Sequence, residues 1–349
     1  MKFSVYFHIF MITGLFQACY HEDADKIIKI ADLSAPIQLK GTPIILSSPD
    51  SLPYIVGKAS LINEGYVFYL YDNANFLLLT DTTYTNRIEF AKKGEGPEEI
   101  MGVSANYTVP LTDRPNTYAL LDPYREILFS YSMEHGLKLE PILDFSKAKS
   151  GFHPKKFQIL KNGKIVSPRS DMKYGLLSYD HSMDQITEWP LGYDFNNKSP
   201  NQDETSIRII EYSPKYGIIG EVYGYLPYII LHDEKSGEII SKIEIPSLRS
   251  VELPNGSKSK SIRSFQMTDR GIWILGDVPD DEENDLLLNI DYNGNVLGYF
   301  QILATSSICV DEKRGTILAI NPNAIEDDKY VLEYKLPDNL REFWQNNKV

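Results

Sequence analysis

Short runs of β-branched, aromatic and leucine residues, separated by polar turns, fill most of the chain. A polar turn followed by such a run recurs six times at intervals of 44 to 54 residues, beginning at Gly65, Asn116, Gly163, Gly217, Gly271 and Gly315. Runs of this kind, bounded by Gly, Asn, Asp and Pro, are typical of β-strands. A period near fifty residues is typical of a repeat architecture in which each unit is one small supersecondary element.

Each unit continues with further strand-like runs. The second run often ends in an aromatic residue and Asp, and these runs cover residues 76–81, 127–131, 176–180, 228–233, 286–291 and 330–334. Turns such as Tyr292-Asn293-Gly294-Asn295 lead into a third run, because Asn-Gly supplies the positive φ of a tight hairpin. A short leading strand, as at 157–160 or 264–267, brings each unit to four antiparallel strands. Six such units predict an all-β chain folded as a six-bladed β-propeller; a pair of β-sandwiches is the alternative, but it would not need six similar units.

The sixth unit predicts how the ring closes. After Lys335-Leu336-Pro337 no fourth strand follows, so this blade would keep an open edge. An unpaired edge exposes backbone donors and acceptors, and the apolar segment 37–46 precedes the first unit. We therefore expect an N-terminal strand to close the last blade of a propeller spanning 27–338, with residues 339–349 as a C-terminal tail.

The N-terminus predicts export. Met1-Lys2 is followed by an apolar run over residues 3–16, which is too short to span a bilayer and has the length of a signal peptide. Ala18-Cys19 resembles the end of a bacterial lipobox, which implies removal of residues 1–18 and lipidation of Cys19. An ordinary secretory signal with an incidental cysteine is the alternative. Three acidic residues within 19–26 resemble the surface-export signal of Bacteroidetes lipoproteins, although any lipoprotein needs such a solvated tether.

A linker between the first two units strengthens the resemblance. Lys92-Lys93-Gly94-Glu95-Gly96-Pro97-Glu98-Glu99-Ile100, together with the lipobox and the six units, resembles the TolB-like and NHL-like six-bladed propeller lipoproteins of Bacteroidetes. In those proteins a Gly-x-Gly-Pro-Gly-Glu type segment joins blades, and here Glu98 stands where that pattern often has Gly. The resemblance implies an outer-membrane lipoprotein, periplasmic or surface-exposed, and it implies no particular activity.

The net charge of the chain limits the kinds of partner that can be expected. Lys and Arg number 35 against 48 Asp and Glu, a net charge of −13 with no basic stripe along the chain. Nucleic acid is therefore not an expected partner, and we expect membrane contact only through the lipid anchor. The domain is expected to be monomeric.

Few residues form a recognisable catalytic or metal-binding pattern. The segment around Gly94, Gly96 and Pro97 is not placed between a strand and a helix, so it is interpreted as a structural turn rather than a phosphate loop. The acidic segments 277–285 and 291–295 lack the EF-hand spacing, and the six histidines lack close partners. No metal, cofactor or catalytic set is predicted. Cys309, in an apolar run, is interpreted as a buried thiol.

The candidate binding residues come from topology. The loops after the second strand of each unit are expected at one face, around the mouth of the central channel. They are rich in Tyr and Arg, which are enriched in binding hot spots, and the predicted ligand-binding residues are Tyr124, Arg125, Arg169, Asp171, Tyr223 and Tyr225. The favoured function is a binding or scaffold module for a protein or glycan partner. The alternative is a glycan hydrolase or lyase, for which two carboxylates about 5–10 Å apart in the channel mouth would be the sign.

Overall fold

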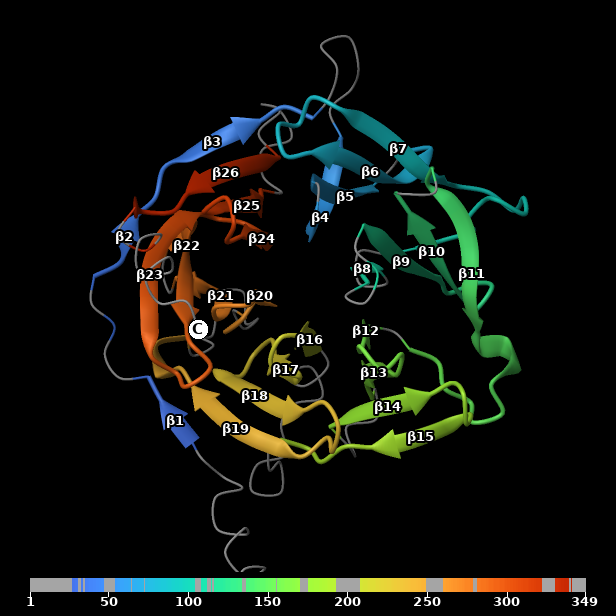
Figure 1. Cartoon of the computed structure of the whole chain (residues 1–349). Coiled ribbons are helices and arrows are strands. Elements are labelled where there is room, and N and C mark those ends of the chain that lie inside the picture. Colours follow the sequence, from blue (N-terminus) through green and yellow to red (C-terminus); the bar gives the residue numbers. More distant parts are fainter. Residues whose placement is uncertain are drawn as a thin grey trace, which may run out of the picture.

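Six small antiparallel sheets are arranged as the blades of a ring (Figure 1). The computed structural model describes residues 27–30, 33, 35–46, 54–63, 65–71, 73–103, 108–111, 114, 116–133, 136–154, 156–169, 175–192, 208–248, 260–278, 281–321, 330–338 and 340. The predicted signal peptide, Cys19, the acidic tether, Asp171 and all of the C-terminal tail except residue 340 lie outside these residues.

The first three blades follow the chain in order. Blade 1 contains β4 (Ile55–Ile62), β5 (Gly65–Tyr71), β6 (Asn75–Asp81) and β7 (Arg87–Lys92). Blade 2 contains β8 (Thr108–Pro110), β9 (Thr117–Asp122), β10 (Ile127–Ser132) and β11 (Lys138–Asp144), followed by the 3-10 helix η2 (Phe145–Lys147). Blade 3 contains β12 (Gln158–Ile159), β13 (Ile165–Pro168), β14 (Leu176–Asp180) and β15 (Gln185–Glu188).

The other three blades also take up strands from the N-terminal segment. Blade 4 contains β16 (Arg208–Ser213), β17 (Ile218–Tyr223), β18 (Tyr228–Asp233), β19 (Ile239–Glu244) and β1 (Ile27–Lys29), and the 3-10 helix η3 (Pro246–Leu248) follows β19. Blade 5 contains β20 (Ser264–Met267), β21 (Ile272–Val278), β22 (Asp281–Ile290), β23 (Val296–Leu303) and β2 (Ile37–Gln38). Blade 6 contains β24 (Ser307–Asp311), β25 (Thr316–Ile320), β26 (Val331–Lys335) and β3 (Gly41–Ile44).

The ring closes as predicted. Strand β3 pairs antiparallel with β26, with Ile44 opposite Val331, so the predicted six-bladed β-propeller with an N-terminal closing strand is confirmed. Blades 4 and 5 additionally gain a fifth strand, because β1 and β2 pair in parallel with the outer strands β19 and β23. The N-terminal segment thus covers sheet edges that would otherwise expose backbone groups. We call residues 27–44 the strap; its strands lie on the outside of the ring (Figure 1).

The core lies between adjacent blades. Because each blade is covered on both faces, its middle strands are apolar without alternation, and every residue of β9 and β25 is buried. Trp273 of blade 5, for example, stacks on Phe300 and packs among buried side chains of blade 6. Among the helices that the structure describes, none has the length and apolar character needed to cross a bilayer.

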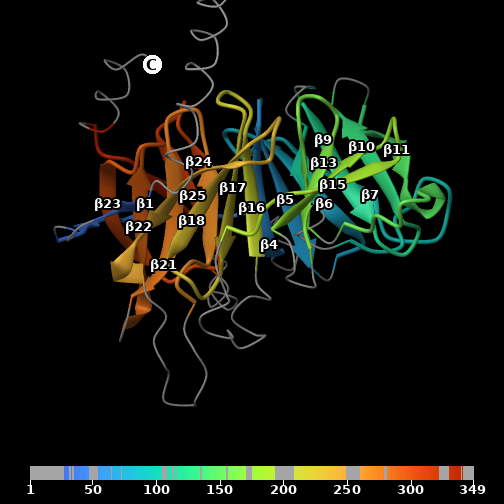
Figure 2. The same cartoon turned by 90° about the horizontal axis from the view of Figure 1, so that it is seen from below.

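The strands run between two ends of the ring, seen from the side in Figure 2. One end, which we call the turn face, carries the turns that join the first strand to the second and the third to the fourth in each blade. Its hairpin turns include 82–86, 181–184, 234–238 and 291–295. The opposite end, the linker face, carries the loops between second and third strands and the starts of the linkers between blades. Among the described residues these include 93–103, 123–126, 224–227, 245–248 and 260–263.

Candidate functional site

The predicted binding residues that the structure describes all lie on the linker face. Tyr124 and Arg125 are in the β9–β10 turn of blade 2, Arg169 follows β13 of blade 3, and Tyr223 and Tyr225 end or follow β17 of blade 4. Their exposure differs: the Tyr124 side chain is 73% exposed, whereas Tyr223 is fully buried, and Arg125, Arg169 and Tyr225 are half-buried. Ligand contact by these residues remains a prediction.

Arg125 holds the linker between blades 1 and 2. Its Nη1 donates to the carbonyl of Glu99 at 2.8 Å and its Nη2 to the carbonyl of Gly96 at 3.1 Å. The carboxylate of Asp122, buried beside it, accepts a hydrogen bond from the Met101 backbone amide at 2.9 Å. Much of the hydrogen-bonding capacity of Arg125 is therefore used within the protein.

The linker itself is folded back tightly. Gly94 N donates to the carbonyl of Ile100 at 3.0 Å, and the Glu99 carboxylate accepts hydrogen bonds from Gly96 N at 3.0 Å and from Lys92 Nζ at 2.6 Å. Gly94 has a φ of 156°, and a Cβ at this position would collide with the Glu99 carboxylate. Glycine is required here for that reason.

A buried ion pair lies between β16 and β17 of blade 4 and contacts blade 3. Arg208 Nε donates to Glu221 Oε1 at 2.7 Å, and His232 Nε2 lies 3.3 Å from Glu221 Oε2. Arg208 also donates to the carbonyls of Arg169 and Gly175. Desolvation opposes ionisation of Glu221, but Arg208 and His232 lower its pKa below the usual value. The pair therefore connects blade 4 to the described residues Arg169 and Gly175 of blade 3.

The innermost strands carry a second group of charges. Lys58 lies in β4 of blade 1, Lys156 just before β12 of blade 3, Lys260 just before β20 of blade 5, and Glu211 in β16 of blade 4. We call these four residues the axial cluster. All four lie in or just before the innermost strands, which surround the axis of the ring (Figure 1), and all four are half-buried.

The cluster interacts across the axis. Burial, followed by repulsion from Lys260 and Lys58, lowers the pKa of Lys156 to about 8. Burial raises the pKa of Glu211 to about 7, and Lys58 partly offsets this. Blades 1, 3 and 5 are not neighbours, and blade 4 lies opposite blade 1 (Figure 1), so these interactions pass through the middle of the ring.

Two of the lysines also connect neighbouring innermost strands. Lys58 Nζ donates to the carbonyl of Thr108 at 3.3 Å, and Lys156 Nζ donates to the carbonyl of Arg208 at 2.8 Å. In the described part of the chain, the Lys260 ammonium has no hydrogen-bond acceptor or ion-pair partner. The described hydrogen-bond acceptors of the ammonium groups of Lys58 and Lys156 are thus neutral backbone carbonyls.

Reasoning from the sequence missed the axial cluster, although a signal was present. Lys58 precedes the repeat glycine Gly65 by seven residues, and Lys156 precedes Gly163 by the same number. Aligning the six units would have placed both lysines at one position of alternate blades. The position of Lys260 differs, since it lies eleven residues before Gly271.

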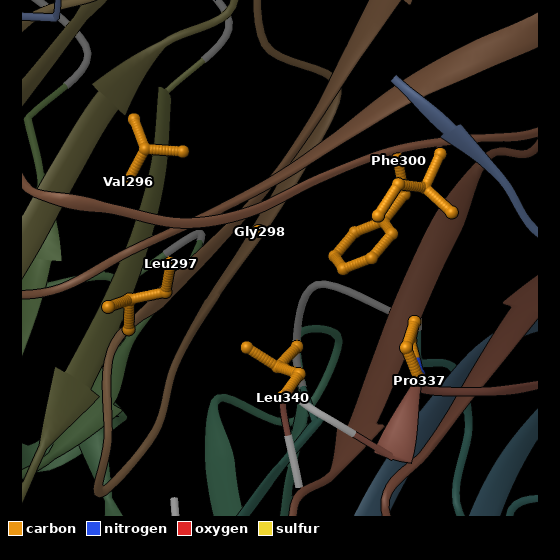
Figure 3. Close-up of a pocket in the computed structure, with 7 residues that line it drawn as sticks. Val296, Leu297, Gly298, Phe300, Pro337 and Leu340 are labelled. Carbon is orange, nitrogen blue, oxygen red and sulfur yellow. The ribbon is translucent and has the colours of Figure 1, made fainter. Parts of the chain in front are cut away.

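A shallow apolar pocket lies away from the axis, on the outer side of blade 5 (Figure 3). It has a volume of about 280 Å³, and its lining residues are Ile37, Val296, Leu297, Gly298, Phe300, Pro337 and Leu340. None of these side chains is polar or charged, so only backbone groups could orient a ligand in this pocket.

Two further sequence interpretations concern metal and thiol chemistry. In the described ranges, no group of three His, Cys, Asp or Glu side chains is arranged to hold a metal ion. Cys309 is a buried free thiol, as predicted, and desolvation raises its pKa to about 12. A thiol with so high a pKa is a poor nucleophile at neutral pH.

Comparison with known proteins shows similarity of fold. No family model matches the chain, and no curated protein matches it. A member of the DUF4221 family from Bacteroides vulgatus has a TM-score of 0.55 at 11% identity, covering 86% of this chain and 96% of that one. A protein from Bacteroides fragilis, named as exported, has a TM-score of 0.54 at 12% identity, with 89% and 98% covered.

A third similar structure has a name that refers to binding. An auxiliary nutrient binding protein from Bacteroides ovatus has a TM-score of 0.52 at 11% identity, covering 85% of this chain and 76% of that one. At such identities the similarity concerns the fold alone. The predicted resemblance to Bacteroidetes propellers is confirmed at that level.

Proposed function

We propose that this chain is an exported binding module of the cell envelope, which captures a protein or glycan partner with the linker face of its propeller. The observation that carries this proposal is the group of charged and aromatic side chains near the axis and on the linker face. Charged side chains from four blades converge on the innermost strands and keep partial exposure, and the exposed Tyr124 lies on the same face. A small number of placed polar and charged groups is what fixes the orientation of a ligand in a binding site.

The export signal and the similar structures support the envelope location. The signal-like residues 1–18 and the Cys19 lipobox agree with a fold shared with a Bacteroides protein named as exported and another named as nutrient binding. We propose that Cys19 carries the lipid anchor. Changing Cys19 to Ala should release a folded protein from the membrane fraction, and continued firm membrane association of this variant would contradict the anchor.

The alternative, a glycan hydrolase or lyase, lacks support at the axis. Glu211 is the one carboxylate of the axial cluster as defined above, and the charge of Lys58 favours its ionised form. Glu221, the next carboxylate in blade 4, is engaged by Arg208 and His232. Glycoside hydrolysis uses two carboxylates that flank the scissile bond, so we propose binding in preference to catalysis.

The linker face can be tested against the turn face. Purified protein is applied to an array of bacterial and host glycans and to purified envelope proteins, and the bound partner is measured by titration. Tyr124→Ala combined with Arg169→Ala should weaken binding at least tenfold without lowering the melting temperature. Tyr216→Ala is the matched control, because Tyr216 is a partly exposed aromatic residue on the turn face. Equal loss in both variants would contradict a linker-face site.

A further inference from the structure

We propose that the axial cluster binds one oxyanion group, a carboxylate, phosphate or sulfate, carried by the ligand of the linker face. This inference rests on the proposed function and specifies its ligand class. Lys58, Lys156 and Lys260 come from alternate blades and approach the axis from three directions. Lys58 and Lys156 each reach the first residue of the next innermost strand, Thr108 and Arg208. An oxyanion has several acceptor oxygens and can therefore accept hydrogen bonds from more than one ammonium group.

Two arginines elsewhere in the fold are neutralised by carboxylates, whereas the lysines of the cluster are not. Arg208 is paired with Glu221, and Arg263 with Asp277 and Asp285. By contrast, Lys58 and Lys156 donate to neutral backbone carbonyls, and each ammonium has three N–H donors. Donors and charge therefore remain available near the axis of a chain whose net charge is −13.

Like charges held together in a desolvated place are unfavourable unless something compensates them. Burial is the main cause of the lowered pKa of Lys156, and the positive charges of Lys260 and Lys58 add to it. Glu211 compensates only in part, since its electrostatic partner in the cluster is Lys58. A bound anion would supply the missing negative charge, which is why perturbed titratable groups gather at functional sites.

The cluster is reached from the linker face. The innermost strands follow the inter-blade linkers, so each begins at the linker face and runs toward the turn face. Lys156 and Lys260 precede the first residues of β12 and β20, at the linker-face ends of these strands, and all four cluster residues are partly exposed. A ligand held by the linker-face loops can therefore present an anionic group to the axis.

The site should favour mildly acidic conditions. Glu211 becomes neutral as pH falls below about 7, which removes a negative charge that repels the anion, and Lys156 is fully charged only below about 8. The other titratable groups that interact with Glu211 are Tyr118 and Cys309, whose pKa values are both raised to about 12. Those two groups stay neutral through this range, so affinity should fall steadily between pH 6 and pH 8.5.

The test is calorimetric titration of the detergent-solubilised full chain with sodium sulfate, inorganic phosphate and D-glucuronate at pH 6.0 and 8.5 and low ionic strength. We expect at least one probe to bind at pH 6.0 and to bind about tenfold more weakly at pH 8.5. The preferred probe distinguishes a sulfate, a phosphate and a sugar carboxylate as the source of the group. Absence of binding by all three at pH 6.0, or affinity that rises with pH, would overturn the proposal.

Variants connect the binding to the cluster. Lys260→Gln should weaken binding at least tenfold with an unchanged melting temperature, because Lys260 Nζ holds no described acceptor. Lys235→Gln, an exposed lysine on the turn face, is the matched control and should bind as wild type. Glu211→Gln should bind at pH 8.5 more tightly than wild type and with a smaller pH dependence. Unchanged affinity in folded Lys260→Gln and Lys156→Gln variants would exclude the cluster.

The outcome separates this inference from the proposed function. If partner capture is lost in the Tyr124→Ala and Arg169→Ala variant but unaffected by Lys260→Gln, the linker face binds the partner and the oxyanion inference fails. If the oxyanions bind the cluster while the Tyr124 and Arg169 variant captures its partner normally, the axial site stands and the proposed use of the outer linker loops fails.

Discussion

The two faces of the propeller use their charged residues differently. On the turn face, aspartates at strand ends accept hydrogen bonds from their own turns: Asp233 from the amides of Lys235 and Ser236, and Asp291 from those of Asn293 and Asn295. On the linker face, Arg125 and Arg208 hold distant segments. Among the described residues, no carboxylate forms an ion pair with a lysine of the axial cluster. The hydrogen-bonding capacity of these turn-face aspartates is used within their own turns. The cluster lysines, by contrast, keep a positive charge that no described carboxylate pairs with.

This difference indicates that some residues of the molecule contribute mainly to stability and others are available for binding. The aspartates named above stabilise their own hairpins, so a change at one of them affects one turn. On the linker face, a change at Arg125 or Arg208 removes a support between distant segments, whereas a change at Lys260 removes no described hydrogen bond of its ammonium group. The following expectations test that division, in order of decreasing effect on stability.

The largest effect is expected from the strap, which belongs to neither face. Deleting residues 27–46 removes β3, which completes blade 6, and the buried side chains of Ile44 and Leu46. The edge of β26 is then unpaired, and we expect loss of the cooperative melting transition or aggregation. Deleting residues 341–349 should leave the melting curve nearly unchanged. Equal melting of both truncations in circular dichroism would contradict closure by the strap.

The next largest effect is expected from the buried support of the linker face. Arg208→Ala leaves the carboxylate of Glu221 buried without its cation, and breaking such a pair costs about 3–5 kcal/mol. The free energy of unfolding, measured by urea denaturation, should fall by that amount. Arg263→Ala should be milder, because Arg263 is partly exposed. A loss below about 1 kcal/mol for Arg208→Ala would show that the pair is not a main support.

A smaller effect is expected from the turn face. Asp233→Ala removes a carboxylate that accepts hydrogen bonds from two backbone amides, which should cost about 1 kcal/mol and leave partner binding unchanged. Backbone and side-chain hydrogen bonds from Ser236 lower the pKa of Asp233. Its stabilising contribution is therefore complete above about pH 4 and is lost as pH falls further. Wild type and variant should converge in stability in acid; a constant difference down to pH 2 would contradict this role.

The smallest effect on stability is expected at Tyr124. The ring is 73% exposed and lies over Gly102, so Tyr124→Ala should change the free energy of unfolding by less than about 0.5 kcal/mol. Its effect on partner binding should nevertheless be large. The comparison is made on one sample by denaturation and by titration, and a variant that loses stability without losing affinity would assign Tyr124 to the fold instead.

The sequence was sufficient for the fold because the repeat is local. Alternating turns and apolar runs indicate strands, and the missing fourth strand of the last unit indicates a closing strand elsewhere. The aromatic-plus-Asp corners of the second runs at 228–233 and 286–291 are the capped turns of blades 4 and 5. Strands β1 and β2 could not be predicted, because they have only three and two residues and form by pairing with edges that only the folded ring provides.

The site was harder to predict because burial cannot be read from residue type. Tyr and Arg favour both binding surfaces and internal support, and Arg125 and Tyr223 are used internally while Tyr124 is exposed. The axial cluster gathers lysines about one hundred residues apart, and only the ring brings them together. Hydrogen bonds to backbone carbonyls, such as that of Lys156 to Arg208, have no signature in the sequence.

The strap also determines how the molecule responds to a mechanical load. A pull on the chain upstream of Ile27 reaches β1 first, where three residues pair in parallel with β19 and Lys29 contacts Glu244 at 3.1 Å. The load then reaches β2 on blade 5, and only afterwards β3. The pairings of β1 and β2 must therefore break, one after the other, before the load reaches β3, which keeps the ring closed. The strap thus protects the closure of the propeller from a pull on the N-terminal side.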